Sequence, residues 1–213
     1  MAEVYAPPDT PLEVIYADRH VLVLVKPTGL LSVPGRGGHL ADCLASRAEA
    51  QFPGARIVHR LDRDTSGLLV MGLTVAAHRD LSIQFQERRT QKRYIALVSG
   101  RPSQPDGVVD LPLAYDPDNK PRQKICHETG RRAITEWKVI GMEGAASRMA
   151  LTPITGRSHQ LRVHMLALGH PILGDPLYHP TDPAPRLMLH AERLGFAHPA
   201  HGRAMAFDCP APF

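Results

Sequence analysis

The chain has 213 residues, a length that fits one domain or one domain with a small added lobe. Apolar residues make up 43% and charged residues 22%, which is typical of a globular protein with a buried core and excludes a disordered chain. Aromatic residues are only 5%, which argues against a surface that binds nucleic acid mainly by stacking bases on many rings. The formal net charge of +4 permits an RNA partner without requiring one.

The basic residues are mostly arginine, with 20 among the 25 lysines and arginines. The planar guanidinium suits phosphates and base edges, although a codon bias of the genome would give the same excess. The three cysteines are far apart and form no CxxC pair, so neither a disulfide framework nor a cysteine zinc site is expected. Residues 1–10 lack the pattern of a signal peptide, and no apolar run approaches the length of a membrane span, which predicts a cytoplasmic protein.

The first half of the chain predicts strands alternating with helices. Residues 21–25 (VLVLV) form a short, β-branched, buried strand that ends before Pro27. Apolar residues at helical spacing predict an amphipathic helix over 39–52. A turn at 59–67 then leads into a second buried strand at 67–73, and a second helix is predicted over 75–89.

The second half is dominated by short segments with strand character, punctuated by Gly, Pro and Asp. One helix is predicted at 159–168, with Ser158 as N-cap and Gly169 past its end. Because strands outnumber helices and neighbour one another in sequence, we expect an α+β fold on a mixed, mostly antiparallel sheet flanked by helices and loops. The predicted strands are 94–98, 108–113, 123–126, 133–140, 149–154, 187–196 and 204–207, the last two forming a hairpin around 198–202.

Asp62 lies in the turn between two apolar segments, flanked by Arg60 and Arg63. Nearby cations favour the ionised carboxylate, which can serve as a nucleophile, a general base or a metal ligand. A turn-capping aspartate between solvated arginines is the simpler interpretation. Asp62 and Asp64 also form a D-x-D pair that would suit Mg²⁺, but no third carboxylate or phosphate loop accompanies them.

The start of the predicted helix at 159–168 is unusually basic. Arg157 precedes it, and His159 and Arg162 fall in its first turn, where the helix dipole disfavours each cation by about 0.3–1 kcal/mol. An anion beside them would remove this cost, and both Asp62 and an RNA phosphate are candidates. An exposed, arginine-rich helix start is the alternative interpretation. Elsewhere, Tyr94 follows a basic run at 88–93 and would suit stacking on an unstacked base, although most tyrosines at the start of a strand are packing residues.

Taken together, these segments resemble the RluA-type family of pseudouridine synthases. Residues 59–67 (HRLDRDTSG) and 155–164 (TGRSHQLRVH) carry the most specific part of the match, and its order and spacing extend from about residue 12 to the end. The chain most resembles the short dual-specificity members, which act on 23S ribosomal RNA and on the tRNA anticodon stem-loop. Further matching segments are 25–30 (VKPTGL), 31–36 (LSVPGR), 92–96 (KRYIA), 109–113 (VDLPL), 165–169 (MLALG) and 170–175 (HPILGD).

The resemblance implies a role for each matching residue. Asp62 matches the catalytic aspartate, and Tyr94 the tyrosine that stacks on the target base. Arg162 matches the basic residue paired with the catalytic carboxylate, and Arg60 the arginine inserted where the uridine leaves the RNA stack. The helix start, Arg157 with His159 and Gln160, is expected to bind RNA.

The resemblance also implies that residues 1–213 form a single catalytic domain without an N-terminal S4 domain. The isomerisation breaks the N1–C1′ bond and rejoins the base through C5, so it needs neither a metal nor another cofactor, and no obligatory protein partner is implied. The uridine must first leave the RNA stack. Whether the aspartate attacks C1′, attacks C6 or removes a ribose proton stays open at this point.

Overall fold

The computed structural model describes residues 5–213; the first four residues of the segment searched for a signal peptide lie outside this range. The described chain divides into two compact units. The first unit comprises residues up to 92 together with 191–212, and the second comprises 93–190 with Phe213. Strands β5 and β11 each contribute residues to both units.

The first unit is built on an antiparallel arrangement of strands. Its strands follow the order β1-β2-β4-β11. In addition, β3 pairs with β4, and β12 pairs with β11. Strands β2 and β4 are buried along their whole length, as the apolar runs in the sequence predict. The strands are β1 (Glu13–Ala17), β2 (Val21–Lys26), β3 (Arg56–Ile57), β4 (Ser66–Gly72), β11 (Leu189–Ala197) and β12 (Ala204–Asp208).

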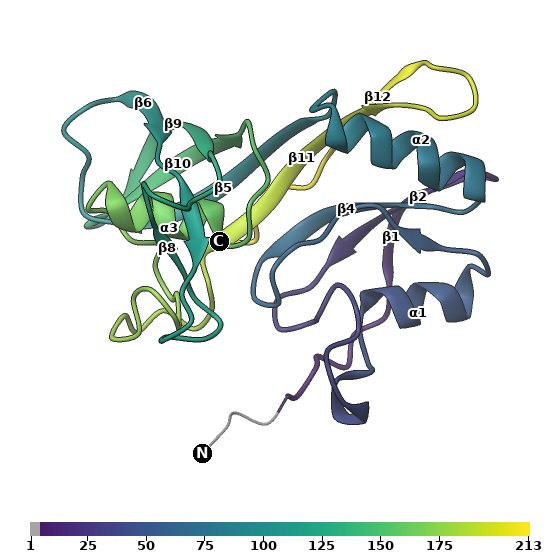
Figure 1. Cartoon of the computed structure of the whole chain (residues 1–213), viewed down its shortest axis with the longest axis horizontal. Helices are drawn as coiled ribbons and strands as arrows, with labels where there is room; N and C mark the ends of the chain where they lie inside the picture. Colours follow the sequence, from purple (N-terminus) through teal and green to yellow (C-terminus); the bar gives the residue numbers. More distant parts are fainter. Residues whose placement is uncertain (1–4) are drawn as a thin grey trace. The chain divides into compact units, whose positions relative to one another are not determined.

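Two helices cover this sheet. Helices α1 (Leu44–Gln51) and α2 (Val75–Gln86) lie on opposite faces of β2 and β4 (Figure 1). This placement explains why both faces of these strands are buried and why their sequences lack polar alternation. On the α2 face, Leu81 and partly buried Phe85 pack into one apolar cluster with the valines of β2 and with Leu194 and Phe196 of β11.

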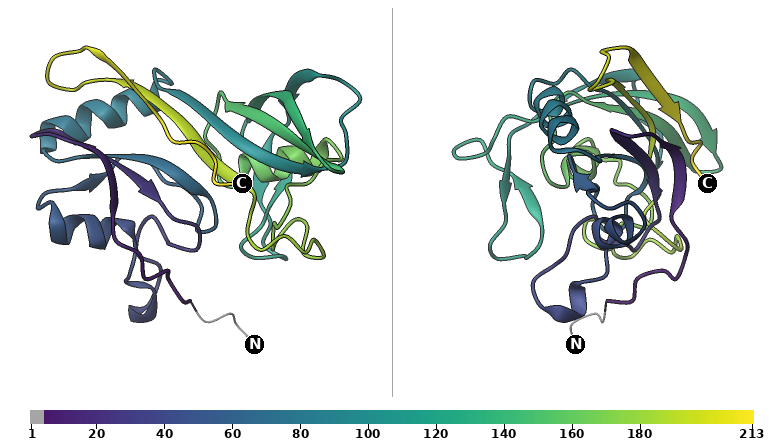
Figure 2. Two further views of the ribbon diagram at one scale, coloured as in Figure 1. Left: turned by 180° about the vertical axis from the view of Figure 1, so that it is seen from behind. Right: turned by 90° about the vertical axis from the view of Figure 1, so that its right-hand side faces the viewer.

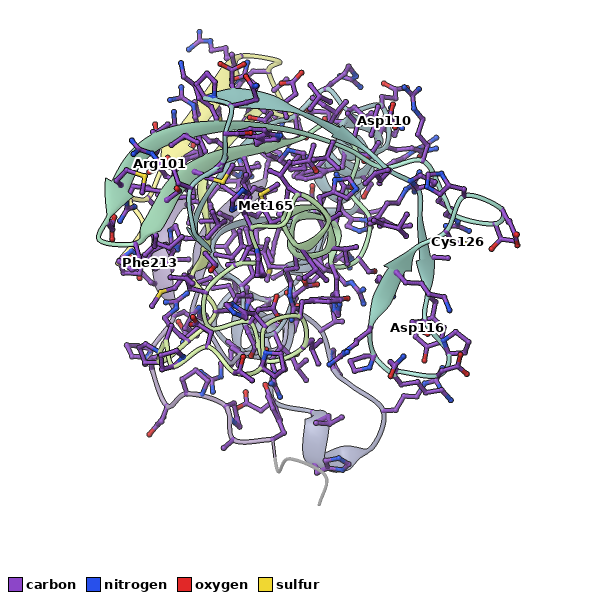
Figure 3. The ribbon with its side chains drawn as sticks, turned by 90° about the vertical axis from the view of Figure 1, so that its left-hand side faces the viewer. Arg101, Asp110, Asp116, Cys126, Met165 and Phe213 are labelled. Atoms are coloured by element: carbon purple, nitrogen blue, oxygen red, sulfur yellow. The ribbon has the colours of Figure 1, made fainter. Side chains whose placement is uncertain are left out.

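The second unit contains a sheet in the order β5-β10-β9-β6 and a separate β7–β8 hairpin. Helix α3 (Gln160–Ala167) contributes Leu161 and Met165 to a core with residues such as Val98 and Leu151. Figure 3 shows Met165 on α3 beside the sheet and Asp116 near the tip of the β7–β8 hairpin, and Figure 2 shows α3 from two further sides. The strands are β5 (Gln91–Ser99), β6 (Asp106–Asp110), β7 (Leu113–Tyr115), β8 (Gln123–Ile125), β9 (Ile134–Glu143) and β10 (Ala146–Pro153).

The predicted α+β class with a mostly antiparallel sheet is confirmed, and so is the β11–β12 hairpin. The helix expected over 39–52 starts late: a 3₁₀ turn at Gly38–Leu40 precedes it, and Cys43 forms a capping box with Ser46 that begins α1 at Leu44. The single strand expected over 108–113 is divided into β6 and the start of β7. The short strands β1 and β3 were not predicted as strands. No helix within residues 5–213 is long and apolar enough to cross a membrane.

The predicted N-cap of α3 was wrong. His159, and not Ser158, is the N-cap residue, and its backbone adopts the left-handed conformation with φ 54° and ψ 16°. This conformation is uncommon for a residue with a side chain, so surrounding contacts must hold it. The predicted end is confirmed, since Gly169 follows α3 with φ 86°.

Candidate active site

Asp62 lies in a tight turn of the first unit, between β3 and β4. The turn is closed by a hydrogen bond from the Thr65 amide to the Asp62 carbonyl oxygen, 3.2 Å long. The Asp62 side chain is half-buried, whereas Arg60 is exposed and Leu61 is buried. The turn therefore presents a carboxylate and an arginine at the surface while an apolar side chain anchors it to the core.

Three side chains from the end of β2 and the segment after it hold the backbone of this turn. Ser32 Oγ donates to the Leu61 carbonyl oxygen at 2.7 Å and accepts from the Leu61 amide at 3.1 Å. Lys26 Nζ donates to the Arg63 carbonyl oxygen at 2.7 Å, and Thr28 Oγ1 donates to that of Asp64 at 2.7 Å. The backbone on both sides of Asp62 is thus fixed by side chains 29 to 37 residues earlier in the sequence. We refer to Lys26, Thr28 and Ser32 as the turn clamp.

Lys26 is the most unusual member of the turn clamp because its side chain is completely buried. Its ammonium group also donates to the carbonyl oxygens of Pro27 at 2.8 Å and Leu30 at 2.6 Å. An ammonium group has three N–H donors, and a buried cation is tolerated only where hydrogen bonds replace its lost water. Lys26 thereby links the end of β2 to the Asp62 turn.

The two acids of the D-x-D pair have different surroundings. Arg63 Nε donates to Asp64 Oδ1 at 2.8 Å, so Asp64 forms an ion pair with its own neighbour. In the part of the chain that the structure describes, no group of three or more His, Cys, Asp or Glu side chains could hold a metal ion. These contacts do not favour a paired-carboxylate metal site at Asp62 and Asp64.

The segment HRLDRDTSG ends with Gly67, and the structure explains why this position is a glycine. Its φ is +117°, and a Cβ atom there would lie 2.3 Å from the backbone oxygen of Ala191 in β11. No side chain fits so close to a neighbouring backbone. The glycine is therefore required for β4 to approach β11 directly after the turn.

His59 supports the turn from its first position. Its ring stacks on Phe85 of α2 with centroids 4.3 Å apart, and its Nε2 accepts a hydrogen bond from the Val70 amide at 3.2 Å. Desolvation and, to a smaller extent, the charge of Lys92 lower the pKa of His59 to about 3. The ring is therefore neutral near pH 7, as an imidazole nitrogen that accepts a backbone N–H must be.

Arg162 lies in the second unit, in the first turn of α3, and its side chain is only 2% exposed. Nε and Nη2 donate to the two carboxylate oxygens of Asp175, both at 2.7 Å, in a bidentate ion pair. The sequence predicted a compensating anion here and proposed Asp62 or a phosphate; within this unit the structure provides Asp175. Asp175 is completely buried and also accepts from the amides of Leu177 and Tyr178.

Gln160, at the start of α3, is buried and uses both ends of its amide within the second unit. Its Nε2 donates to the Ile134 carbonyl oxygen at 2.9 Å, and its Oε1 accepts from Thr155 Oγ1 at 2.7 Å and from the Arg157 amide at 3.0 Å. The half-buried Arg157 donates from Nε to the Arg132 carbonyl oxygen at 3.2 Å. Gln160 thus fixes the loop that carries Arg157.

His159 is held in its left-handed conformation by Tyr178. The two rings meet edge to face, and His159 Nδ1 lies 2.8 Å from the Tyr178 hydroxyl oxygen. The same hydroxyl accepts from the Gln123 amide at 2.7 Å. Tyr94 is half-buried in β5, opposite Leu151 of β10, and packs against the core of the second unit.

Within the first unit the structure brings Asp62 and Arg60 into one turn, and within the second it gathers Arg157, His159, Gln160 and Arg162 at the start of α3. Sequence reasoning missed the supporting residues. Three segments that match the RluA-type pattern, VKPTGL, LSVPGR and HPILGD, contain all of these residues except Tyr178, but the residues received no role. The missed residues are Lys26, Thr28, Ser32, Asp175 and Tyr178.

Comparison with known proteins decides the family. Residues 20–167 match the family described as RNA pseudouridylate synthase. The chain belongs to this family. It is 53% identical to the "Dual-specificity RNA pseudouridine synthase RluA" of Escherichia coli strain K12, with 99% of both chains covered, and 47% identical to the protein of the same name from Pasteurella multocida, with 98% of both covered.

The fold agrees with this membership. The solved structure of human RNA pseudouridylate synthase domain containing 1 matches with a TM-score of 0.80 at 30% identity, covering 98% of this chain and 87% of the human one. A second human structure, domain containing 4, matches with a TM-score of 0.75 at 25% identity, covering 94% and 88%. The predicted RluA-type resemblance is thus confirmed: the protein is an RNA pseudouridine synthase, an isomerase whose substrate is RNA.

Proposed function

We propose that this pseudouridine synthase has dual specificity, converting uridines in stem-loops of 23S ribosomal RNA and of the tRNA anticodon arm, and that Asp62 carries the chemistry. Relatives that are 47–54% identical over nearly their whole length are dual-specificity RNA pseudouridine synthases by name, which supports dual specificity. The turn clamp around Asp62 is the structural observation that carries the catalytic assignment. A fold that uses Ser32, Lys26 and Thr28 to hold one turn is organised to keep its half-buried carboxylate in a defined position.

The reaction needs one ionised carboxylate and no external group donor. The N1–C1′ bond of uridine breaks, the base rotates, the C5–C1′ bond forms, and the proton on C5 is lost while N1 gains one. Asp62 would act as nucleophile at C1′ or C6, or remove a ribose proton to begin elimination. We propose that Tyr94 and Arg162 act in the same reaction, Tyr94 by stacking on the base and Arg162 as the cation matched to the catalytic aspartate.

The target base has to leave the RNA stack, at a cost of a few kcal/mol that is smallest in a loop. We propose that Arg60, exposed beside Asp62, occupies the space that the base vacates. Arg157 and His159 would bind the RNA around the target, and the buried Gln160 would contribute by holding their loop. Contacts of this kind predict that RNA affinity falls steeply with salt, since counterions are released on binding.

We further propose that the protein acts in the cytoplasm, where its RNA substrates are made, as one catalytic domain without a metal, cofactor or obligatory protein partner. Purified protein treated with EDTA tests the metal-free part directly. Conversion of uridine at the untreated rate is the expected result. A loss of activity that Mg²⁺ restores, and that persists with RNA folded in Mg²⁺ beforehand, would contradict it.

Purified protein incubated separately with an anticodon stem-loop and with full-length 23S RNA, followed by pseudouridine mapping, tests the substrate proposal. The expected result is conversion of a small number of loop uridines in each RNA. Conversion in only one of them would reject dual specificity while leaving the enzyme class unchanged. A complementary map of RNA from a deletion strain, with and without the gene restored, identifies the natural positions.

A further inference from the structure

We infer that Asp175 is a positioning residue for the reaction: it holds the guanidinium of Arg162 in the single orientation that catalysis uses. The inference rests on the proposed role of Arg162, and it assigns a function to an acid outside the Asp62 turn. Its starting observation is the bidentate pair, in which Nε and Nη2 of Arg162 each lie 2.7 Å from one oxygen of Asp175.

Stability alone does not account for the Arg162–Asp175 pair. Both side chains are almost completely removed from solvent, at 2% and 0% exposure. Removing two charges from water costs about as much as their attraction returns, and apolar residues of similar volume often stabilise a fold equally well. Arg162 also lies in the first turn of α3, where the helix dipole disfavours a cation. A buried arginine at this position is better explained by a need for its charge and shape.

The fold fixes the plane of the Arg162 guanidinium from two directions. Asp175 binds its edge, while the Tyr178 ring faces it with the Cζ atom 5.1 Å from the ring centroid. Tyr178 is itself fixed through its hydroxyl, which contacts His159 Nδ1 at 2.8 Å and the Gln123 amide at 2.7 Å. An exposed arginine has many rotamers, whereas this one is confined to one arrangement.

Asp175 is itself held in place and kept ionised by its surroundings. Asp175 Oδ1 accepts from the amides of Leu177 at 2.9 Å and Tyr178 at 3.0 Å in addition to Arg162. Burial by itself would raise the pKa of Asp175, but Arg162 and these amides bring the pKa below its usual value, so the acid stays ionised. The preceding Gly174 has φ +66°, and a Cβ there would lie 1.8 Å from the Arg186 carbonyl oxygen. The glycine lets the chain enter the turn that presents Asp175.

The test measures kcat and KM on an anticodon stem-loop for Asp175→Asn and Asp175→Glu. Asn removes the charge, and Glu keeps it but cannot retain the same bidentate and amide contacts. A displacement of about 1 Å in catalytic geometry lowers rates by about a hundredfold, so we expect a fall in kcat of that order with KM nearly unchanged. Asp182→Asn is the matched control, because Asp182 lies in the same loop and supports its backbone. Its Oδ1 accepts hydrogen bonds from the amides of Gly174 and Ala184. Its kcat should stay near that of the wild type.

Chemical rescue separates positioning from a general effect on folding. Arg162→Ala should lose activity, and ethylguanidinium should restore part of it, because Asp175 can bind the added guanidinium in the vacated space. In Arg162→Ala/Asp175→Asn the rescue should disappear. Asp175→Glu guards against misfolding of the Asn variant, since it keeps the buried charges balanced.

The outcomes separate this inference from the proposed function. Wild-type kcat in both Asp175 variants, with Arg162→Ala inactive, overturns the inference and leaves the role of Arg162 standing. Equal losses in Asp182→Asn and the Asp175 variants would assign the acid to loop structure alone and also overturn it. Full activity of Arg162→Ala would reject both the catalytic role of Arg162 and the positioning role of Asp175. Absence of pseudouridine with the wild-type protein would reject the proposed function itself.

Discussion

The two regions that carry the candidate catalytic residues hold them in different ways. In the first unit, the turn clamp binds backbone atoms of Leu61, Arg63 and Asp64, so Asp62 is positioned through the chain on which it lies. In the second unit, Asp175 and Tyr178 bind the guanidinium of Arg162 itself. Aspartate has two rotatable side-chain bonds, so fixing its backbone largely places its carboxylate, whereas arginine has four and requires support at its end.

This difference implies different consequences of mutation. Loss of a turn-clamp residue leaves buried carbonyl groups without donors, so it should lower stability and activity together. Loss of Asp175 should act mainly on kcat, because it changes the orientation of one charged group. The first prediction tests whether the residue that the clamp serves is catalytic at all.

Asp62→Asn should reduce the rate of pseudouridine formation by at least about 10²–10⁴-fold, the range expected when a catalytic acid–base or nucleophilic group is removed. The substitution keeps the size of the side chain and leaves the backbone contacts of the turn in place, so the melting temperature should change little. Single-turnover conversion of a labelled stem-loop provides the measurement.

Asp64→Asn is the matched control, two residues away in the same turn and paired with Arg63. It should retain activity within about tenfold, since the loss concerns only a half-exposed ion pair. Equal losses in both variants would revive the paired-carboxylate interpretation of the D-x-D segment, and unchanged activity of Asp62→Asn would end the assignment of Asp62.

Lys26→Met should lower the free energy of unfolding by about 3 kcal/mol or more, because three carbonyl oxygens in buried surroundings lose their donor. It should also lower kcat, since Arg63 adjoins Asp62. Ser32→Ala removes a single hydroxyl and should cost about 1–2 kcal/mol. Urea unfolding and steady-state kinetics on the same preparations measure both quantities.

Lys124→Met is the control for loss of a lysine charge, because Lys124 is half-exposed and pairs with Asp116 on the β7–β8 hairpin. Its stability should stay within about 0.5 kcal/mol of the wild type. A Lys26→Met protein with normal stability but low kcat would behave like the Asp175 variants. This would contradict the expected difference between the turn clamp and the support of Arg162.

The sequence predicted the parts of both regions that depend on local pattern. The apolar runs at 21–25 and 67–73 gave β2 and β4, and the turn containing Asp62 followed from the segments on either side of it. The position of Arg162 in the first turn of α3 correctly indicated an anion, and within the second unit this anion is Asp175. The sequence did not single out Asp175, because it is 13 residues away and its role depends on how the chain returns to α3.

The remaining errors have the same physical origin. A lysine at the end of a strand is normally exposed, and nothing local shows that Lys26 is buried against carbonyl groups of a turn 37 residues later. Ser158 is the better N-cap by intrinsic preference, yet His159 takes that position because its ring contacts Tyr178. Helix caps are local, but the contacts that select between two candidate caps are tertiary.

A fall in pH should weaken the support of one region and not of the other, and this is the smallest of the expected effects on stability. The pKa of His59 is lowered to about 3 in the folded protein, against about 6.5 in the unfolded chain, so the unfolded chain takes up the proton first. The contribution of neutral His59 is therefore fully present above about pH 6.5 and declines as the pH falls. Because a one-unit pKa difference corresponds to about 1.4 kcal/mol, the wild type should lose about 1–2 kcal/mol relative to His59→Gln between pH 7 and pH 5.

Urea unfolding of the two proteins at both pH values measures this difference, in which the contributions of the other histidines cancel. A parallel dependence in the two proteins would show that protonation of His59 does not oppose folding. The Arg162–Asp175 pair provides the contrast, because the lowered pKa of Asp175 keeps it ionised throughout this range. Its contribution is lost only as the pH falls through that lowered pKa, so mild acid should weaken the support of the Asp62 turn while the support of Arg162 stays intact.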